Sequence, residues 1–300
     1  MPCFHPLRAF RTTAGDVVFT DVSRDRIVEE LTLACGQCIG CRLERSRQWA
    51  VRIMHEASTH ESNCFITLTY DDDHLPDDLS LNYKHFQDFI KRYRKQVSPD
   101  LIRYFVAGEY GDKLQRPHYH ACIFGHCFSD LRLHGKSESG ATIFTSEFLQ
   151  QLWPFGYSSV GALTFESAAY VARYVLKKVT GAQSDRHYEL IDPTSGEIAK
   201  RAPEFCRMSL KPGIGAKWLG KFMTDVYPHD HVISRGHPAK PPRYYDKLLD
   251  RSNPDLMESI KVSRAEKALE RAADHTTDRL RVKETIAKRR VSDFLKRRLK

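Results

Sequence analysis

The chain contains no uninterrupted apolar run that approaches the ~20 residues needed to cross a membrane. Its N-terminus lacks the apolar stretch of a secretory signal peptide. The phosphate-binding pattern Gly-x4-Gly-Lys-Ser/Thr, which marks many ATP-driven motors, is also missing. We therefore expect a soluble, intracellular protein without a membrane partner and without a nucleotide-driven motor of its own.

Acidic residues are fewer than basic ones, with 38 Asp and Glu against 47 Lys and Arg and a net charge of +9. Such a surplus favours a polyanionic partner. Residues 255–300 hold 14 basic against 8 acidic residues, so that +6 of the charge lies in this last segment. Its alternating charges predict a helical tail that docks on DNA or proteins, or a solvated helical extension.

The eight cysteines, without a secretory signal, indicate reduced thiols or metal ligands rather than a disulfide framework. Three of them form the pattern Cys35-x2-Cys38-x2-Cys41. A tetrahedral zinc site needs four ligands, and Cys3 or His5 can supply the fourth. Free cysteines before a helix, or an iron–sulfur cluster, are the alternatives.

The middle of the chain alternates between strand-like and helix-like patterns. Strands are predicted at 64–70, 104–110, 116–124 and 157–165, and helices at 42–57, 82–97 and 146–153. From residue 64 the order is β-α-β-β-α-β, which predicts an α+β class with a ferredoxin-like antiparallel sheet and helices on one side.

Two histidines alternate in the strand at 116–124. Successive strand residues point to opposite faces, so His118 and His120 share one face. If the polar turn at 111–115 closes a symmetric hairpin, Glu109 lies opposite His118. Two imidazoles and a carboxylate can hold a divalent ion. The alternative is a half-buried polar strand face without a metal.

A second chemical pattern lies on the helix predicted at 167–178. Tyr170, Tyr174 and Lys178 are spaced four apart and therefore share one helical face. Tyrosines at this spacing belong either to a core or to an active site, and the lysine that continues the stripe is unusual for a buried face.

Together these segments resemble the HUH-type endonucleases that start rolling-circle replication, in particular the replication initiators of microviruses of the gokushovirus branch. The matching segments cover roughly residues 64 to 180. They are FITLTY at 65–70, GEYG at 108–111, RPHYH at 116–120 and YVARYVLKK at 170–178.

The resemblance implies roles for individual residues. His118 and His120 would bind Mg2+ or Mn2+, with Glu109 as the third ligand. Tyr170 and Tyr174 would be the nucleophiles.

Basic residues would contact the substrate. Lys178 would assist catalysis by neutralising the phosphate or lowering a tyrosine pKa, or would simply complement the helix dipole. Arg116 and Lys177 are further candidates for DNA contact. Lys211 and Lys217 lie in a stretch of interleaved basic and aromatic residues, which suits stacking and phosphate contact.

The chain is accordingly divided into a cysteine-rich segment and basic helix (1–60), an HUH nuclease core (61–180), a DNA-contacting or packing extension with a linker (181–254) and a basic helical tail (255–300). The expected activity is metal-dependent nicking of single-stranded origin DNA, folded as a hairpin, by tyrosine attack, followed by rejoining into a circle. A host helicase and DNA polymerase would be partners, in the host bacterial cytoplasm. A non-catalytic origin-binding protein and an HUH transposase or relaxase are the alternative functions.

Overall fold

The computed structural model describes the chain except for residues 1–2, 21–25, 100, 112–113, 138–139, 175–183, 192–197 and 297–300, and it leaves the side chains of a few helix and strand residues undescribed, Tyr174 among them. The described chain forms two compact units, Met1–Arg45 with Glu258–Lys300, and Ser46–Met257. No described helix is both long and apolar enough to cross a bilayer.

The first unit contains a small antiparallel sheet in the order β2-β1-β3. Its strands are β1 (Leu7–Thr12), β2 (Val17–Val18) and β3 (Ile27–Leu33). Helix α8 (Pro254–Glu270) leads into this unit, followed by the 3-10 helix η2 (Ala272–His275) and α9 (Thr277–Lys296). These helical elements occupy most of residues 255–300.

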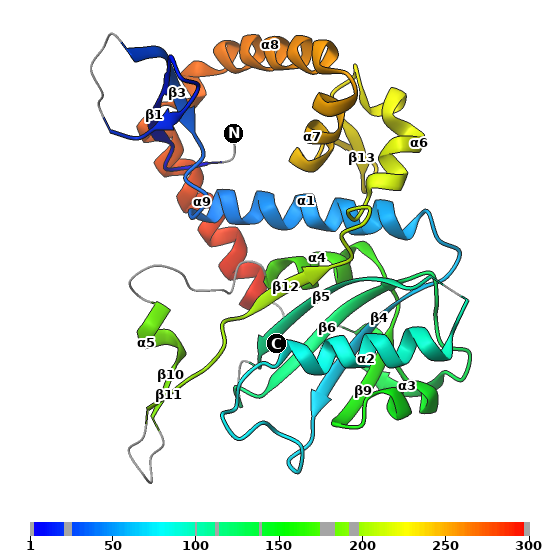
Figure 1. Ribbon diagram of the computed structural model, residues 1–300. Helices are drawn as coiled ribbons and strands as arrows, with labels where there is room; N and C mark the ends of the chain where they lie inside the picture. The colour runs from blue at the N-terminus through cyan, green and yellow to red at the C-terminus, as the bar shows by residue number, and fades with distance from the viewer. Residues whose placement is uncertain are drawn as a thin grey trace. The chain divides into compact units, whose positions relative to one another are not determined.

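The second unit is built on a seven-stranded antiparallel sheet in the order β12-β5-β6-β4-β9-β8-β7. Figure 1 labels β12, β5, β6, β4 and β9 of this sheet. The bounds are β4 (Asn63–Tyr70), β5 (Arg103–Tyr110), β6 (Pro117–Phe124), β7 (Arg132–Lys136), β8 (Thr142–Thr145), β9 (Gly156–Gly161) and β12 (Phe205–Met208). The α+β class with a large antiparallel sheet is confirmed. Strands β7, β8 and β12, which extend the sheet at both edges, were not predicted.

Helices α2 (Tyr83–Gln96) and α3 (Glu147–Leu152) cover one face of this sheet, as predicted. Each begins at a side-chain cap: Asn82 Oδ1 accepts from the Lys84 N–H and Ser146 Oγ accepts from the Leu149 N–H, both at 3.0 Å. The apolar residues of this face form the larger core, in which Trp153 is fully buried.

The opposite face is covered by α1 (Ile39–Ala57) and α4 (Phe165–Tyr174). Ile53 and Val171 pack there against Phe105 and Cys122 of the sheet. The prediction of helices on one side is therefore wrong, because β5 and β6 carry buried residues on both faces and both faces must be covered.

Strand β9 ends four residues before the predicted strand end at Phe165, which already belongs to α4. The reason is a reciprocal cap: Ser167 Oγ accepts from the Thr164 N–H at 2.8 Å, and Thr164 Oγ1 accepts from the Ser167 N–H at 3.2 Å. This cap starts the helix that carries Tyr170.

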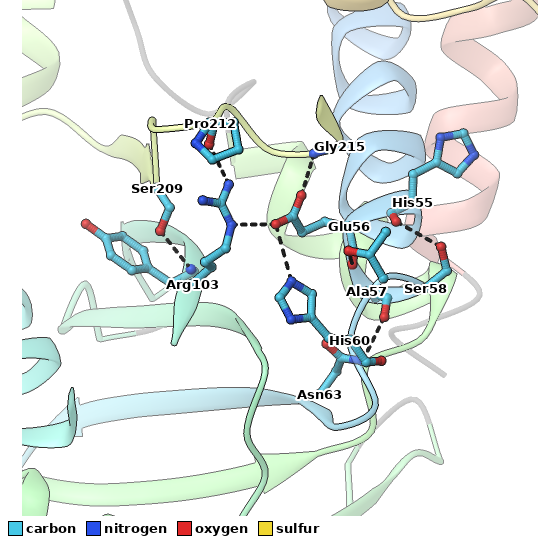
Figure 2. A network of polar contacts seen from close by, with 12 residues as sticks. His55, Glu56, Ala57, Ser58, His60, Asn63, Arg103, Ser209, Pro212 and Gly215 are labelled. Atoms are coloured by element: carbon cyan, nitrogen blue, oxygen red, sulfur yellow. Dashed lines mark hydrogen bonds and ion pairs between the residues drawn. The ribbon is translucent and has the colours of Figure 1, made fainter. Parts of the chain in front are cut away.

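A buried ion pair fixes the chain that follows β12. The Glu56 carboxylate accepts from Arg103 Nε at 2.5 Å and from the Gly215 N–H at 2.6 Å (Figure 2). Arg103 also donates to the carbonyl oxygen of Pro212 at 2.6 Å. The pair therefore joins α1, β5 and the loop before helix α6 (Ala216–Val226).

The remaining elements of this unit are short. They are α5 (Ser184–Tyr188), β10 (Glu189–Ile191), β11 (Ile198–Lys200), α6 (Ala216–Val226), β13 (Val232–Ser234), β14 (His237–Ala239) and α7 (Arg243–Ser252). Strands β10 and β11 form one small antiparallel pair, and β13 and β14 form another.

Candidate active site

The β5–β6 hairpin brings Glu109, His118 and His120 together. Its register pairs Glu109 with His118, as the symmetric turn predicted. Oε1 of Glu109 lies 2.8 Å from Nε2 of His118 and 3.0 Å from Nε2 of His120. Residues two apart on a strand share a face, so one carboxylate oxygen meets both imidazoles.

The other ring nitrogens are held by neighbouring groups. Nδ1 of His118 donates to the carbonyl oxygen of Arg116 at 3.0 Å, because a carbonyl can only accept. Nδ1 of His120 lies 2.9 Å from Oγ1 of Thr67, which pairs with His120 across β4 and β6. Both rings thus direct Nε2 at the carboxylate.

This arrangement calls for a positive charge between the three groups. In a neutral His118 whose proton is on Nδ1, Nε2 carries a lone pair and faces the carboxylate oxygen of Glu109, so two acceptors meet. A proton or a metal ion can resolve this conflict. The three ligand atoms lie within 4.8 Å of one another, so the donor set fits one cation.

The carboxylate is buried, with 2% of Glu109 exposed. Burial raises the pKa of this carboxyl, but hydrogen bonds with His118 and His120 outweigh burial and hold the pKa well below its ordinary range. Glu109 is therefore a permanent anion at neutral pH. The ring of Phe65 stacks on His120 at 5.6 Å and closes one side of the cluster.

Tyr170 on α4 lies beside this cluster. Its ring centroid is 5.1 Å from that of His120, and the planes meet at 79°. The guanidinium of Arg173 lies 5.8 Å from the Tyr170 ring. Tyr174 ends α4 one turn after Tyr170, but its side chain is outside the described part.

The predicted basic residues have different surroundings. Lys177 and Lys178 lie outside the described residues. Arg116 donates to the carbonyl oxygen of Tyr70 at 3.0 Å and to the carboxylate of Asp72, and so holds the acidic turn after β4.

Lys211 and Lys217 have exposed side chains, before and within α6 respectively. The carbonyl oxygen of Lys211 accepts from Arg103 at 3.4 Å.

Thr67 is a site residue that sequence reasoning missed. Strand alternation and the register of β4 place it on the face that carries the two histidines, beside His120. The sequence carried this signal in the alternating FITLTY run at 65–70, but the register between β4 and β6 was needed to read it.

The four predicted cysteines form a second cluster, in the first unit. Sγ of Cys3 lies 3.6 Å from Sγ of Cys35 and 3.9 Å from that of Cys38, and Sγ of Cys41 lies 4.0 Å from that of Cys35. A disulfide needs about 2.05 Å, so these are separate thiols. Cys3, rather than His5, is the fourth member of the cluster.

Backbone N–H groups favour the thiolate at one member of this cluster. Burial raises the pKa of the Cys38 thiol, but hydrogen bonds, first among them one from the Phe4 N–H at 3.3 Å, lower it to about 6. A thiolate is the form of cysteine that binds metals, so this environment suits a metal site.

The amino-acid sequence is similar to a known protein family and to several phage proteins. The family described as Replication-associated protein ORF2/G2P matches residues 63–179. The chain is 35% identical over 270 residues to replication-associated protein VP4 of Bdellovibrio phage phiMH2K, covering 85% of this chain and 79% of that protein.

Two further relatives match this chain, one over nearly its whole length and the other over about three quarters of it. Replication-associated protein ORF2 of Spiroplasma virus 4 is 31% identical over 295 residues, covering 94% of this chain and 85% of that protein. Replication-associated protein ORF4 of Chlamydia phage 1 is 33% identical over 226 residues, which cover 72% of this chain and 53% of that protein. No solved structure matches the chain.

Proposed function

Because the chain belongs to the family of replication initiators of microvirus-like phages, we propose that it nicks single-stranded origin DNA with a tyrosine nucleophile beside a metal ion and later rejoins the product. The observation that carries this proposal is the 5.1 Å approach of the Tyr170 ring to His120, a member of the Glu109 cluster. A protein that only binds the origin would need neither the tyrosine nor the cluster of Glu109, His118 and His120.

The metal centre consists of Glu109, His118 and His120, and Mg2+ or Mn2+ is the proposed ion. A divalent ion at this position would polarise a non-bridging phosphate oxygen and offset the charge that develops in the transition state. Thr67 and the Arg116 carbonyl orient the two imidazoles, so that the ligand atoms converge before any substrate arrives. The HUH endonuclease fold is proposed on the same grounds.

The nicking step is an exchange of one phosphodiester for another. The hydroxyl oxygen of Tyr170 forms a bond to phosphorus while the bond from phosphorus to the 3′ oxygen breaks. The phenolic proton is released and the 3′ oxygen gains a proton, which leaves a 5′-phosphotyrosine and a free 3′-hydroxyl. The phosphotyrosine conserves the bond energy needed for rejoining, and a host polymerase can extend the 3′-hydroxyl.

Two nucleophiles suit a circular product. Tyr174 follows Tyr170 by one helical turn, so the two residues are at i and i+4 of α4, the spacing of one helical face. One tyrosine holds the 5′ end through a round of synthesis, and the other attacks the regenerated origin. The new 3′-hydroxyl then attacks the first phosphotyrosine and closes the circle, with Lys178, and also Lys177, stabilising the phosphate.

The substrate and partners follow from this chemistry. A phosphate inside an ordinary duplex cannot align with a tyrosine, so the origin must be single-stranded or extruded as a hairpin. A host helicase and polymerase, in the host cytoplasm, would supply the unwinding and synthesis. Arg116, Lys211 and Lys217 are proposed DNA contacts.

We also propose that the four cysteines hold a structural zinc ion. Four sulfurs each about 2.3 Å from a tetrahedral zinc lie about 3.8 Å apart. The measured separations of 3.6, 3.9 and 4.0 Å fit that geometry. Such a site would tie residue 3 to the start of α1 in the small first unit.

Covalent capture tests the nuclease proposal. Single-stranded DNA carrying the phage origin is labelled at its 3′ end and incubated with Mn2+, and labelled protein is detected after denaturation. Wild-type protein should form the adduct, whereas Tyr170→Phe/Tyr174→Phe should form none while origin binding is retained. His120→Ala should also lose the adduct, because the metal ligand is gone.

Tyr83→Phe is the matched control. This half-buried tyrosine pairs with the Tyr104 hydroxyl at 3.0 Å and packs against the core on the opposite face of the sheet, so its loss should leave the adduct unchanged. An undiminished adduct in the double tyrosine variant would refute the assignment. Origin binding by the wild type without any adduct would favour the non-catalytic alternative, and joining to unrelated DNA ends would favour a transposase.

A further inference from the structure

A cleft of about 290 Å³ lies on the sheet of the second unit, beside the cluster of Glu109, His118 and His120. It is lined by Thr67, Thr69, His134, Thr145, Gln150, Tyr157, Ser158 and Ser159. Its volume is at the lower end for a small-molecule site, roughly 300 Å³, and suits a group the size of a nucleoside.

Strand register connects this cleft to the candidate active site. On β4, Thr67 pairs with His120 on one side and Ser159 on the other, and Thr69 pairs likewise with His118 and Tyr157. Directly paired residues share a face, so the cleft residues Thr67, Thr69, Tyr157 and Ser159 lie on the surface that carries the two histidines. Ser158, which pairs with the core residue Leu68 and bonds Gln150 of α3 at 2.9 Å, lines the cleft from the other face of β9. Strands are spaced about 4.8 Å apart, which puts β9 about 10 Å from the histidines.

The lining is polar but carries no fixed charge. All eight side chains can form hydrogen bonds, and six of them present a hydroxyl group. None of the eight is lysine, arginine, aspartate or glutamate. A phosphate would find no cation here, so the chemistry suits an uncharged ligand with several donors and acceptors.

An exposed aromatic ring adds a second kind of contact. Tyr157 is 70% exposed although it lies within strand β9. Exposed aromatic rings at the edge of a polar cleft are the surfaces on which unpaired bases stack, and every base offers such a face.

We propose that this cleft binds one unpaired nucleobase of the substrate, close to the scissile phosphate. The inference rests on the proposed function, because it assumes that the backbone phosphate is bound at the histidines. Tyr157 stacks on the base, and the hydroxyls of Thr69 and Ser159 contact its edge. The cleft therefore selects which base stands next to the nick.

Binding experiments test this without relying on cleavage. The protein carries Tyr170→Phe/Tyr174→Phe, and fluorescence anisotropy measures its affinity for labelled oligo(dT), oligo(dC) and an abasic oligonucleotide of equal length. Adding Tyr157→Ala should weaken binding to the base-containing strands roughly ten-fold. Binding to the abasic strand should not change, because only phosphates are left to contact.

Further variants separate stacking from edge recognition. Tyr157→Phe should keep most of the affinity, whereas Thr69→Val should change the ratio of affinities for oligo(dT) and oligo(dC). Phe19→Ala, which removes another exposed aromatic ring (60% exposed), is the matched control and should have no effect. Equal melting temperatures would show that each variant is folded.

The outcomes distinguish the two proposals. If Tyr157→Ala weakens binding to abasic and base-containing strands equally, or weakens neither, the base-binding inference is overturned while the nicking proposal is untouched. If adduct formation fails but Tyr157→Ala shows the base-dependent loss, the nicking proposal falls and the cleft remains a base-binding site. A protein that binds none of the strands would overturn the base-binding inference, and the nicking proposal would then be decided by adduct formation on origin DNA.

Discussion

Replacing Glu56 with glutamine should destabilise the second unit far more than its single-atom change suggests. The side chain is fully buried, and its two oxygens accept from different donors, Arg103 Nε and the Gly215 N–H (Figure 2). A glutamine amide has one acceptor oxygen, so its NH2 group would face one of these donors. Arg103, itself 8% exposed, would also lose its counter-charge.

The expected cost follows from those two losses. Removing one partner of a buried ion pair costs about 3–5 kcal/mol, which for a unit of this size lowers the melting temperature by roughly 6–20 °C. Asp88→Asn is the matched control, because the Asp88 carboxylate forms ion pairs with Lys84 and Lys91 at the surface. An exposed ion pair contributes about 0–1 kcal/mol, so this variant should stay close to the wild type.

The pH dependence identifies the charge as the cause. Burial raises the pKa of Glu56, but hydrogen bonds from His60, Gly215 and Arg103 outweigh burial and lower the pKa below its ordinary 4.5. A carboxylate with a lowered folded-state pKa contributes stability that is complete above about pH 4.5 and is lost as the pH falls through the folded-state value.

Urea unfolding of wild type, Glu56→Gln and Asp88→Asn at pH 7 and pH 3.5 measures both effects. The difference between wild type and Glu56→Gln should be large at pH 7 and smaller at pH 3.5. A difference that does not change with pH, or one no larger than that of Asp88→Asn, would show that the ion pair does not hold this loop on the sheet.

Two further predictions concern other buried groups. Burial against the Trp218 ring lowers the pKa of His55 to about 4, so the His55 ring should titrate near pH 4 by NMR. Between pH 6.5 and 4 only the unfolded chain takes up this proton, so the free energy of unfolding should fall by up to about 3 kcal/mol over that range. A titration midpoint at or above pH 6.5 would contradict this prediction. Metal analysis should find one zinc ion per chain in the wild type and in Cys127→Ser, but none in Cys38→Ser; a zinc content unaffected by Cys38→Ser would exclude the four-cysteine site.

The local signals in the sequence were strong enough to predict the central elements. Period-two alternation and a short polar turn predicted the hairpin register that pairs Glu109 with His118. The N-cap at Asn82 was also predictable, because a capping side chain bonds within the next two or three residues. The fourth member of the cysteine cluster was narrowed to Cys3 or His5, because a tetrahedral zinc site needs four ligands and only three cysteines lie close together in the sequence.

Contacts between distant residues were not predictable in the same way. Glu56 and Arg103 are 47 residues apart, and Glu56 and Gly215 are 159 apart. A glutamate on a helix with many charges carries no local sign that it will be buried. Strand β12, with only four residues, was missed because its pairing with β5 comes from this long-range attachment and not from its own periodicity.

The same register argument explains why the candidate site is built on strands. A shift of one residue between β5 and β6 would turn His118 and His120 into the apolar core and bring Tyr119 to the site face. Tyr119 prevents such a shift, because its buried hydroxyl donates to the Asn82 carbonyl oxygen at 2.8 Å and lies 2.8 Å from the Tyr70 hydroxyl on the opposite face. These hydrogen bonds of Tyr119 on one face of the sheet therefore fix the position of His118 and His120 on the other face. We expect that Tyr119→Phe, although remote from Glu109, His118 and His120, weakens Mn2+ binding at the proposed metal site by loosening this register. An unchanged Mn2+ affinity in calorimetric titration would contradict this.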